Sequence, residues 1–181
     1  MKFSHQPLQW RLRAPEAKCA FRPWLIDQGS LTKRIQIRCN AFSVQHVRIK
    51  RGKPCLDEAA LVGLPSRQQA ILREVYLYCG DQPVVFAHSV LPHSSLCGPW
   101  QALSRLGNKP LGATLFSNPV VKRTPLEYKK LGPRHELYRR ACRMLNTTPP
   151  FLWARRSVFS LRGYPILVTE VFLPKILELP K

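Results

Sequence analysis

The chain has 181 residues, of which 45% are hydrophobic and 22% charged, and its formal net charge is +19 at pH 7. This length and composition fit one globular domain with a full core and exclude a disordered chain. No apolar run approaches the roughly 20 residues of a membrane span, and the N-terminus lacks the continuous apolar segment of a secretory signal. We therefore expect a cytoplasmic protein in which a basic, loosely held segment, 1–22, precedes one domain, 23–181.

The charge comes from 29 basic residues against 10 acidic ones. Such an excess attracts polyanions, which include nucleic acid, anionic lipid and acidic metabolites. The basic residues are spread along the whole chain, and no helix-turn-helix, RNP-type aromatic motif or zinc finger accompanies them. We therefore expect an anionic ligand and no nucleic-acid partner, although charge alone leaves nucleic-acid binding open as an alternative.

The six cysteines lie far apart in the sequence, at positions 19, 39, 55, 79, 97 and 142. They form no C-x-x-C pair, and no histidine stands at the spacing of a zinc site, so we expect no metal. In a cytosolic chain of this size cysteines are mostly reduced and serve as small apolar residues. We interpret all six in that way.

The first half of the chain mixes short helices with strands. Proline at the first position and glycine at the end predict a helix over 23–29, and Ser30 can cap a further turn over 31–35. Residues 35–51 favour strands, with a hairpin turn at 39–41. A loop with one helical turn, 57–61, follows.

The second half is dominated by two predicted hairpins. Alternating sequences around Gly80 predict the first hairpin, and a turn at 162–164 predicts the second. The intervening elements are two helices, a strand and a longer helix. In chain order we expect strands at 71–79 and 83–92, helices at 99–107 and 110–116, a strand near 120–128, a helix at 134–145, and strands at 152–161 and 166–174. Adjacent strand pairs with few helices between them favour an α+β fold, a single antiparallel sheet with helices packed against it.

One basic side chain stands on an apolar strand face. Alternation over 71–79 puts Arg73 on the same face as Val75, Leu77 and Cys79. A guanidinium cannot be neutralised by a pKa shift, so a buried arginine needs an anion. The sequence leaves two alternatives open for Arg73, a salt bridge to a protein carboxylate or a fork for a ligand carboxylate.

One acidic side chain stands in a strand that is apolar on both faces. Over 166–173, Glu170 shares its face with Ile166, Val168 and Phe172. An ionised carboxylate there must be paired, coordinated or used as an acid or base. Composition favours a pair with one of the many arginines, and a catalytic role is the alternative.

Several familiar catalytic patterns are absent from the sequence, among them G-x-S-x-G, the P-loop, G-x-G-x-x-G and H-E-x-x-H. What remains is a carboxylate and an arginine on separate hairpins of one predicted sheet. This combination suits a small anionic organic molecule that arginine holds and glutamate acts on.

Seven collinear segments make the chain resemble the bacterial chorismate pyruvate-lyases, which make 4-hydroxybenzoate for ubiquinone. The segments are 27–34 (DQGSLTKR), 72–79 (LREVYLYC), 90–92 (VLP), 97–99 (CGP), 106–116 (LGNKPLGATLF), 152–157 (LWARRS) and 167–174 (LVTEVFLP). They cover most of residues 24–174. No single motif is decisive, but the ordered set is specific.

The resemblance implies an enclosed ligand pocket beneath mobile flaps. By resemblance, Arg73 takes the ring carboxylate with help from backbone amides near Leu31 and Leu111, and Glu170 faces the hydroxyl end. Leu31 stands where methionine is common in the family, a near-isosteric change. By resemblance His88, which stands where family members carry an arginine, is also expected to contact the substrate. A single-point hydrogen bond cannot reproduce a bidentate fork, so we expect substrate binding to be weaker or more pH-dependent, or Arg155 or Arg156 to substitute.

The resemblance also implies a cofactor-free lyase that converts chorismate to 4-hydroxybenzoate and pyruvate. Aromatisation of the ring supplies the driving force, and Glu170 is either the base or an anchor for the hydroxyl. We expect a monomer, and the charge suggests peripheral contact with anionic membrane. The alternative is a non-catalytic sensor of the same fold; 22 residues before Pro23 are too few for the DNA-binding domain of such regulators.

Overall fold

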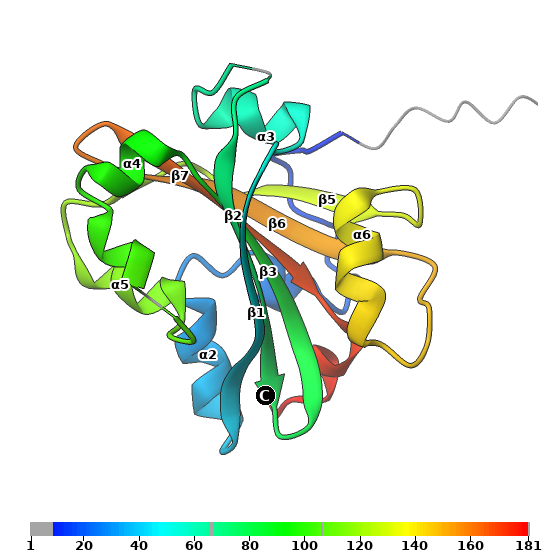
Figure 1. Ribbon diagram of the computed structural model, residues 1–181. Helices are drawn as coiled ribbons and strands as arrows, with labels where there is room; N and C mark the ends of the chain where they lie inside the picture. The colour runs from blue at the N-terminus through cyan, green and yellow to red at the C-terminus, as the bar shows by residue number, and fades with distance from the viewer. Residues whose placement is uncertain (1–8, 66, 106, 181) are drawn as a thin grey trace, which may run out of the picture.

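A computed structural model describes residues 9–65, 67–105 and 107–180 (Figure 1). In this part of the chain seven strands form one sheet, in the order β1-β2-β3-β7-β6-β4, with β5 also paired to β6. All neighbouring strands are antiparallel. The predicted α+β class and the single antiparallel sheet are therefore confirmed.

The strands follow the alternation in the sequence. The two predicted hairpins are β2–β3 and β6–β7, and they lie side by side because β3 pairs with β7. The strand bounds are β1 Phe42–Gly52, β2 Ala70–Cys79, β3 Gln82–Leu91, β4 Lys122–Arg123, β5 Glu127–Leu131, β6 Leu152–Leu161 and β7 Tyr164–Phe172.

Short helices cover both faces of the sheet (Figure 1). Clusters of buried apolar side chains join α1, α2, α4 and α5 to one face and α3 and α6 to the other. The helix bounds are α1 Arg22–Leu25, α2 Leu31–Arg38, α3 Leu56–Leu61, α4 His93–Cys97, α5 Leu111–Ser117 and α6 Glu136–Ala141, with 3₁₀ turns at Gln101–Arg105, Cys142–Met144 and Pro174–Glu178. We call the face under α2 and α5 the pocket face and the opposite one the back face.

The prediction of a strand beginning at Ile35 was wrong. The helix that Ser30 caps, through its hydroxyl accepting from the Lys33 amide at 3.4 Å, continues to Arg38. Leu31 and Ile35 are both buried, as an i, i+4 pair on one helix face must be, and this packing overrides the β-branched residues. Residues 39–41 link α2 to β1 and form no hairpin turn.

Two further elements differ from the prediction. The strand expected near 120–128 is split into β4 and β5, with Pro125 between them. The helix expected over 99–107 begins earlier, as α4, and continues as a 3₁₀ turn over Gln101–Arg105; Leu106 lies outside the described residues.

The interpretation of all six cysteines as reduced was also wrong. Cys39 and Cys79 form a disulfide across 40 residues of sequence, with their Cα atoms 5.7 Å apart. The pairing of β1 with β2 brings the end of α2 next to the end of β2, a proximity that sequence spacing does not reveal. The other four cysteines are free.

The boundary suggested between residues 22 and 23 stays a prediction, and residues 1–8 lie outside the described part. Residues that follow pack against the sheet: Arg11 and Tyr128 exchange backbone hydrogen bonds of 3.0 and 2.8 Å. Trp10 donates its indole N–H to Asp57 at 2.9 Å. None of the helices in the described part of the chain has the length and apolar composition that a membrane crossing requires.

Candidate active site

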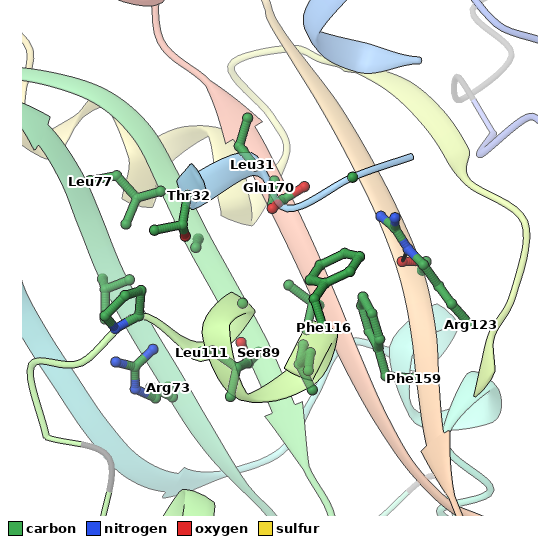
Figure 2. A pocket seen from close by; sticks show the side chains of 18 residues that line it. Leu31, Thr32, Arg73, Leu77, Ser89, Leu111, Phe116, Arg123, Phe159 and Glu170 are labelled. Atoms are coloured by element: carbon green, nitrogen blue, oxygen red, sulfur yellow. Dashed lines mark hydrogen bonds between the residues drawn. The ribbon is translucent and has the colours of Figure 1, made fainter. Parts of the chain in front are cut away.

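A pocket lies on the pocket face of the sheet, beneath α2 and α5 (Figure 2). Four strands, β2, β3, β6 and β7, contribute its floor, and the start of α2 together with one side of α5 contributes its roof. Its charged and polar lining residues are Thr32, Arg73, Ser89, Arg123, Ser157 and Glu170. The rest of the lining is mostly apolar, as ligand sites usually are.

Strand register explains why these side chains meet. Arg73 is opposite Ser89, and Glu170 lies between Ala87 on one neighbour strand and Arg155 on the other. Because side chains alternate along each strand, all of them point to the same face. The period-two assignment of Arg73 and Glu170 to their strand faces is confirmed.

Arg73 is a buried cation with no protein anion. Arg73 is only 3% exposed, and its Nη2 donates to the carbonyls of Gly107 at 3.0 Å and Lys109 at 2.9 Å. Its Nε is buried without a hydrogen-bond partner, and no carboxylate among the described residues forms an ion pair with it. Burial lowers the pKa of Arg73, yet a guanidinium stays charged at neutral pH. Such a group requires an anion that the described residues do not supply.

Glu170 is held by a buried arginine. The Arg155 Nε donates to Glu170 Oε2 at 2.5 Å, and the Arg155 Nη1 donates to the carbonyls of Trp24 and Asp27 at 2.9 and 2.5 Å. Arg155 is 1% exposed, whereas the Glu170 side chain keeps 19% of its surface accessible and lines the pocket. Arg155, predicted as a ligand-binding residue, therefore lies behind the carboxylate and orients it.

Two helices begin at the pocket. Leu31 opens α2 and Leu111 opens α5, and both side chains are buried in its lining. The first amides of a helix have no partner within the helix, so both starts offer N–H groups. The two helix starts lie close together: a Cβ built on Gly112 would be in van der Waals contact, at 3.4 Å, with the side-chain oxygens of Ser30 and Thr32.

Sequence reasoning missed Arg123, which reaches the pocket from the short strand β4 (Figure 2). A two-residue strand has no periodicity to detect, so no pattern marked it. Ser157 and Phe159 also line the pocket, and these two could have been found, since they continue the alternation from Arg155 along β6.

The expectation that His88 contacts the ligand is corrected. His88 pairs with Glu74 and Thr169 in the sheet and therefore lies on the back face, outside the pocket lining. It is 1% exposed, with Nε2 3.4 Å from Glu58 and Nδ1 3.3 Å from Glu74. Burial would lower the pKa of His88, but the two carboxylates outweigh burial and raise it to about 9. His88 is a structural cation.

The pocket is nearly filled by its own lining. Its cavity volume is about 40 Å³, far below the roughly 300 Å³ at which small-molecule pockets begin. The cavity must therefore widen before an aromatic acid can enter it. Within the residues described, no group of three or more histidine, cysteine, aspartate or glutamate side chains could hold a metal ion.

Comparison with known proteins identifies a family for the chain. A sequence model of the chorismate lyase family matches residues 11–179. A probable chorismate pyruvate-lyase of Nitrosospira multiformis is 57% identical over 87% of this chain and 88% of its own. Another, from Nitrosomonas europaea, is 49% identical over 96% of this chain and 97% of its own.

Solved structures with a similar fold are much more distant in sequence. A GntR-family transcriptional regulator from Bacillus cereus is 13% identical with a TM-score of 0.54, covering 77% of this chain and 96% of that one. The ligand-binding domain of a putative GntR-family regulator from Bordetella bronchiseptica is 14% identical with a TM-score of 0.53, covering 74% and 84%. These structures support the fold alone. The family match and the relatives show that the chain belongs to the chorismate lyase family.

Proposed function

We propose that the protein is a chorismate pyruvate-lyase, which eliminates pyruvate from chorismate to give 4-hydroxybenzoate in the first committed step of ubiquinone biosynthesis. The observation that carries the proposal is Arg73, a buried guanidinium without a carboxylate partner among the described residues, in the same pocket as Glu170. The family relatives supply the reaction class, and the pocket supplies groups suited to it.

The proposed pose puts the ring carboxylate at Arg73 and the hydroxyl at Glu170. The two side chains project into the pocket from different strands, β2 and β7 (Figure 2). Amides at the starts of α2 and α5 would assist Arg73, because a helix N-terminus favours negative charge. The apolar side chains between these polar ends, among them Val75 and Val168, would contact the ring.

The chemistry requires one proton to move. The C4 proton leaves, its electron pair forms the C3–C4 double bond of the aromatic ring, and the C3–O bond to the enolpyruvyl group breaks. The released enolate takes a proton on its methylene carbon to become pyruvate. Glu170, oriented by Arg155, is the candidate group to accept the C4 proton or to hold the 4-hydroxyl.

We also propose that the reaction needs no cofactor, since aromatisation itself drives it. Treatment with a chelator followed by desalting should leave turnover unchanged. Loss of turnover, with recovery on adding back a divalent metal, would contradict this part of the proposal.

The direct test is to mix the purified protein with chorismate and to measure 4-hydroxybenzoate and pyruvate in equal amounts. Heat-denatured protein serves as the control for spontaneous breakdown. If the folded protein forms neither product but binds 4-hydroxybenzoate, the sensor alternative replaces the proposal.

The charge supports a second proposal, that the protein is a monomer that contacts anionic membrane. A second hollow, of about 760 Å³, lies between the N-terminal segment and β5, and its charged lining residues are Arg11, Arg13, Glu16, Lys18, Lys129 and Lys130. Five cations against one acid favour an anionic surface. We expect the protein to co-sediment with liposomes that contain phosphatidylglycerol and not with neutral liposomes. Equal sedimentation with both kinds of liposome would reject contact with anionic membrane. Light scattering would measure the molar mass and so test whether the protein is a monomer.

A further inference from the structure

A second arginine without an acidic partner lies in the pocket, on the side away from Arg73 (Figure 2). The Arg123 Nε donates to the Ser157 hydroxyl at 2.8 Å, and its Nη1 donates to the Gln28 carbonyl at 2.7 Å. Its guanidinium lies 5.5 Å from the ring centre of Phe116 and 5.0 Å from that of Phe159. These neutral partners fix the group in place and leave Nη2 without a hydrogen-bond partner among the described residues.

The charge of Arg123 is not balanced by the protein. Burial lowers the pKa of Arg123, and the carboxylates of Glu170 and Asp27 oppose this shift, but Glu170 already pairs with Arg155 and Asp27 with Arg34. No ion pair joins Arg123 to a carboxylate in the part of the chain that the structure describes. Three guanidinium groups at the site, on Arg73, Arg123 and Arg155, face one carboxylate, so two positive charges remain.

A dianion would balance this excess, and the proposed substrate is one. Chorismate has a carboxylate on its ring and another on the enolpyruvyl group, which an ether oxygen links to C3. Arg73 comes from β2 and Arg123 from β4, so the two cations approach the ligand from opposite sides (Figure 2). A ligand with a single carboxylate would leave one of them uncompensated.

We infer that Arg123 binds the enolpyruvyl carboxylate of the substrate and thereby distinguishes chorismate from 4-hydroxybenzoate, which lacks this group. The inference rests on the proposed function and completes its substrate site. When the C3–O bond breaks, the ether oxygen keeps the bonding electrons and becomes the enolate oxygen next to this carboxylate. A guanidinium already oriented there stabilises the charge that develops on the leaving group.

The test compares Arg123→Gln with Lys122→Gln, a neighbouring exposed residue that loses the same charge. We expect Arg123→Gln to raise the KM for chorismate roughly 10- to 100-fold, the usual effect of losing a charged hydrogen bond to a ligand. Its Kd for 4-hydroxybenzoate, measured by calorimetry, should change less than about twofold. Lys122→Gln should change neither, and Arg123→Lys, which keeps the charge, should lie between.

The inference fails if Arg123→Gln keeps the KM of the wild type. It also fails if Arg123→Gln weakens chorismate and 4-hydroxybenzoate equally, since the residue then only anchors the segment around Gln28. Both outcomes are distinct from failure of the proposed function, in which the wild-type protein itself would not turn over chorismate.

Discussion

The two faces of the central sheet differ in whether their buried charged side chains have partners of opposite charge. On the back face, Glu74, His88, Thr169, Arg156 and Glu127 form one row across five strands, in which each cation has acidic neighbours. Arg140 from α6 adds an ion pair to Glu74, and Asp57 from α3 adds one to Arg156. On the pocket face, by contrast, Arg73 and Arg123 have no carboxylate partner among the described residues.

This difference separates stability from ligand binding. Burying a charge is costly, and a partner of opposite charge offsets part of that cost. Removing one partner leaves the other charge buried and uncompensated, which destabilises the fold strongly. Unpaired cations on the pocket face destabilise the empty protein, and a bound anion relieves that cost. The back face should therefore respond to substitution in its stability, and the pocket face in its activity.

The largest expected effect is on catalysis, from Glu170→Gln. This change keeps the size of the side chain but removes its ability to take a proton, so kcat should fall by about 10²- to 10⁴-fold. The melting temperature should change by no more than a few degrees. Glu178→Gln, on the exposed 3₁₀ turn that follows β7, is the matched control and should keep full activity. Full activity in Glu170→Gln would return this residue to a purely structural pair with Arg155.

The largest expected effect on stability comes from Glu74→Gln. It removes a carboxylate shared by His88 and Arg140 and should lower the free energy of unfolding by roughly 3 kcal/mol in urea titrations. The kcat of the protein that remains folded should be unchanged, because Glu74 faces away from the pocket.

Arg73→Met is the counterpart on the pocket face. It should abolish binding of 4-hydroxybenzoate while leaving the free energy of unfolding within about 1 kcal/mol of the wild type, because it removes an unpaired buried charge. A large stability loss in Arg73→Met, or a loss of activity in folded Glu74→Gln, would break the separation of the two faces.

His88 predicts how stability depends on pH. Its pKa is about 9 in the folded protein against 6.5 for the free side chain, so its contribution is complete below pH 6.5 and disappears as pH rises to 9. At about 1.4 kcal/mol per unit, the loss over this window should be roughly 3–4 kcal/mol. His88→Gln should reduce the loss of unfolding free energy between pH 6.5 and 9. An unchanged loss would contradict the assignment of this pH dependence to His88.

Glu74 determines how the free energy of unfolding changes at acidic pH. Burial raises its pKa, but His88 and Arg140 outweigh burial and lower it to about 2 from 4.5. Its contribution is therefore complete above pH 4.5 and is lost as pH falls toward 2. Glu74→Gln should weaken this part of the profile in the same urea titrations.

The smallest effect expected is from Arg155→Lys. Lysine keeps the charge beside Glu170 but cannot bond the carboxylate and the carbonyls of Trp24 and Asp27 together. We expect kcat to fall about tenfold while the KM for chorismate changes little, because Glu170 is less well oriented. A loss of stability with an unchanged kcat would make Arg155 a structural residue only.

Much of this arrangement followed from local sequence. Alternation over residues 71–79 and 166–173 was strong enough to define both hairpins and to assign Arg73 and Glu170 to their faces. The end of α2 was missed because Ile35 and Ile37 favour strands, although Ile37 is 80% exposed on the helix. The disulfide was missed because it depends on contacts between residues 40 positions apart.

The charges of the site were harder to assign. Whether His88 or its neighbour faces the pocket depends on the register of β3, and a single sequence gives no pairing partner for it. The pairing of Arg155 with Glu170 needs the β6–β7 register in the same way. Arg123 stands in a strand of two residues, too short for any periodic signal.

The most direct test of the central claim is a structure with 4-hydroxybenzoate bound. We predict its carboxylate within hydrogen-bond distance of the Arg73 guanidinium and its hydroxyl beside Glu170, with the cavity enlarged and the back-face row of Glu74, His88 and Arg156 unchanged. A ligand bound outside this pocket, or bound with its carboxylate away from Arg73, would contradict the account.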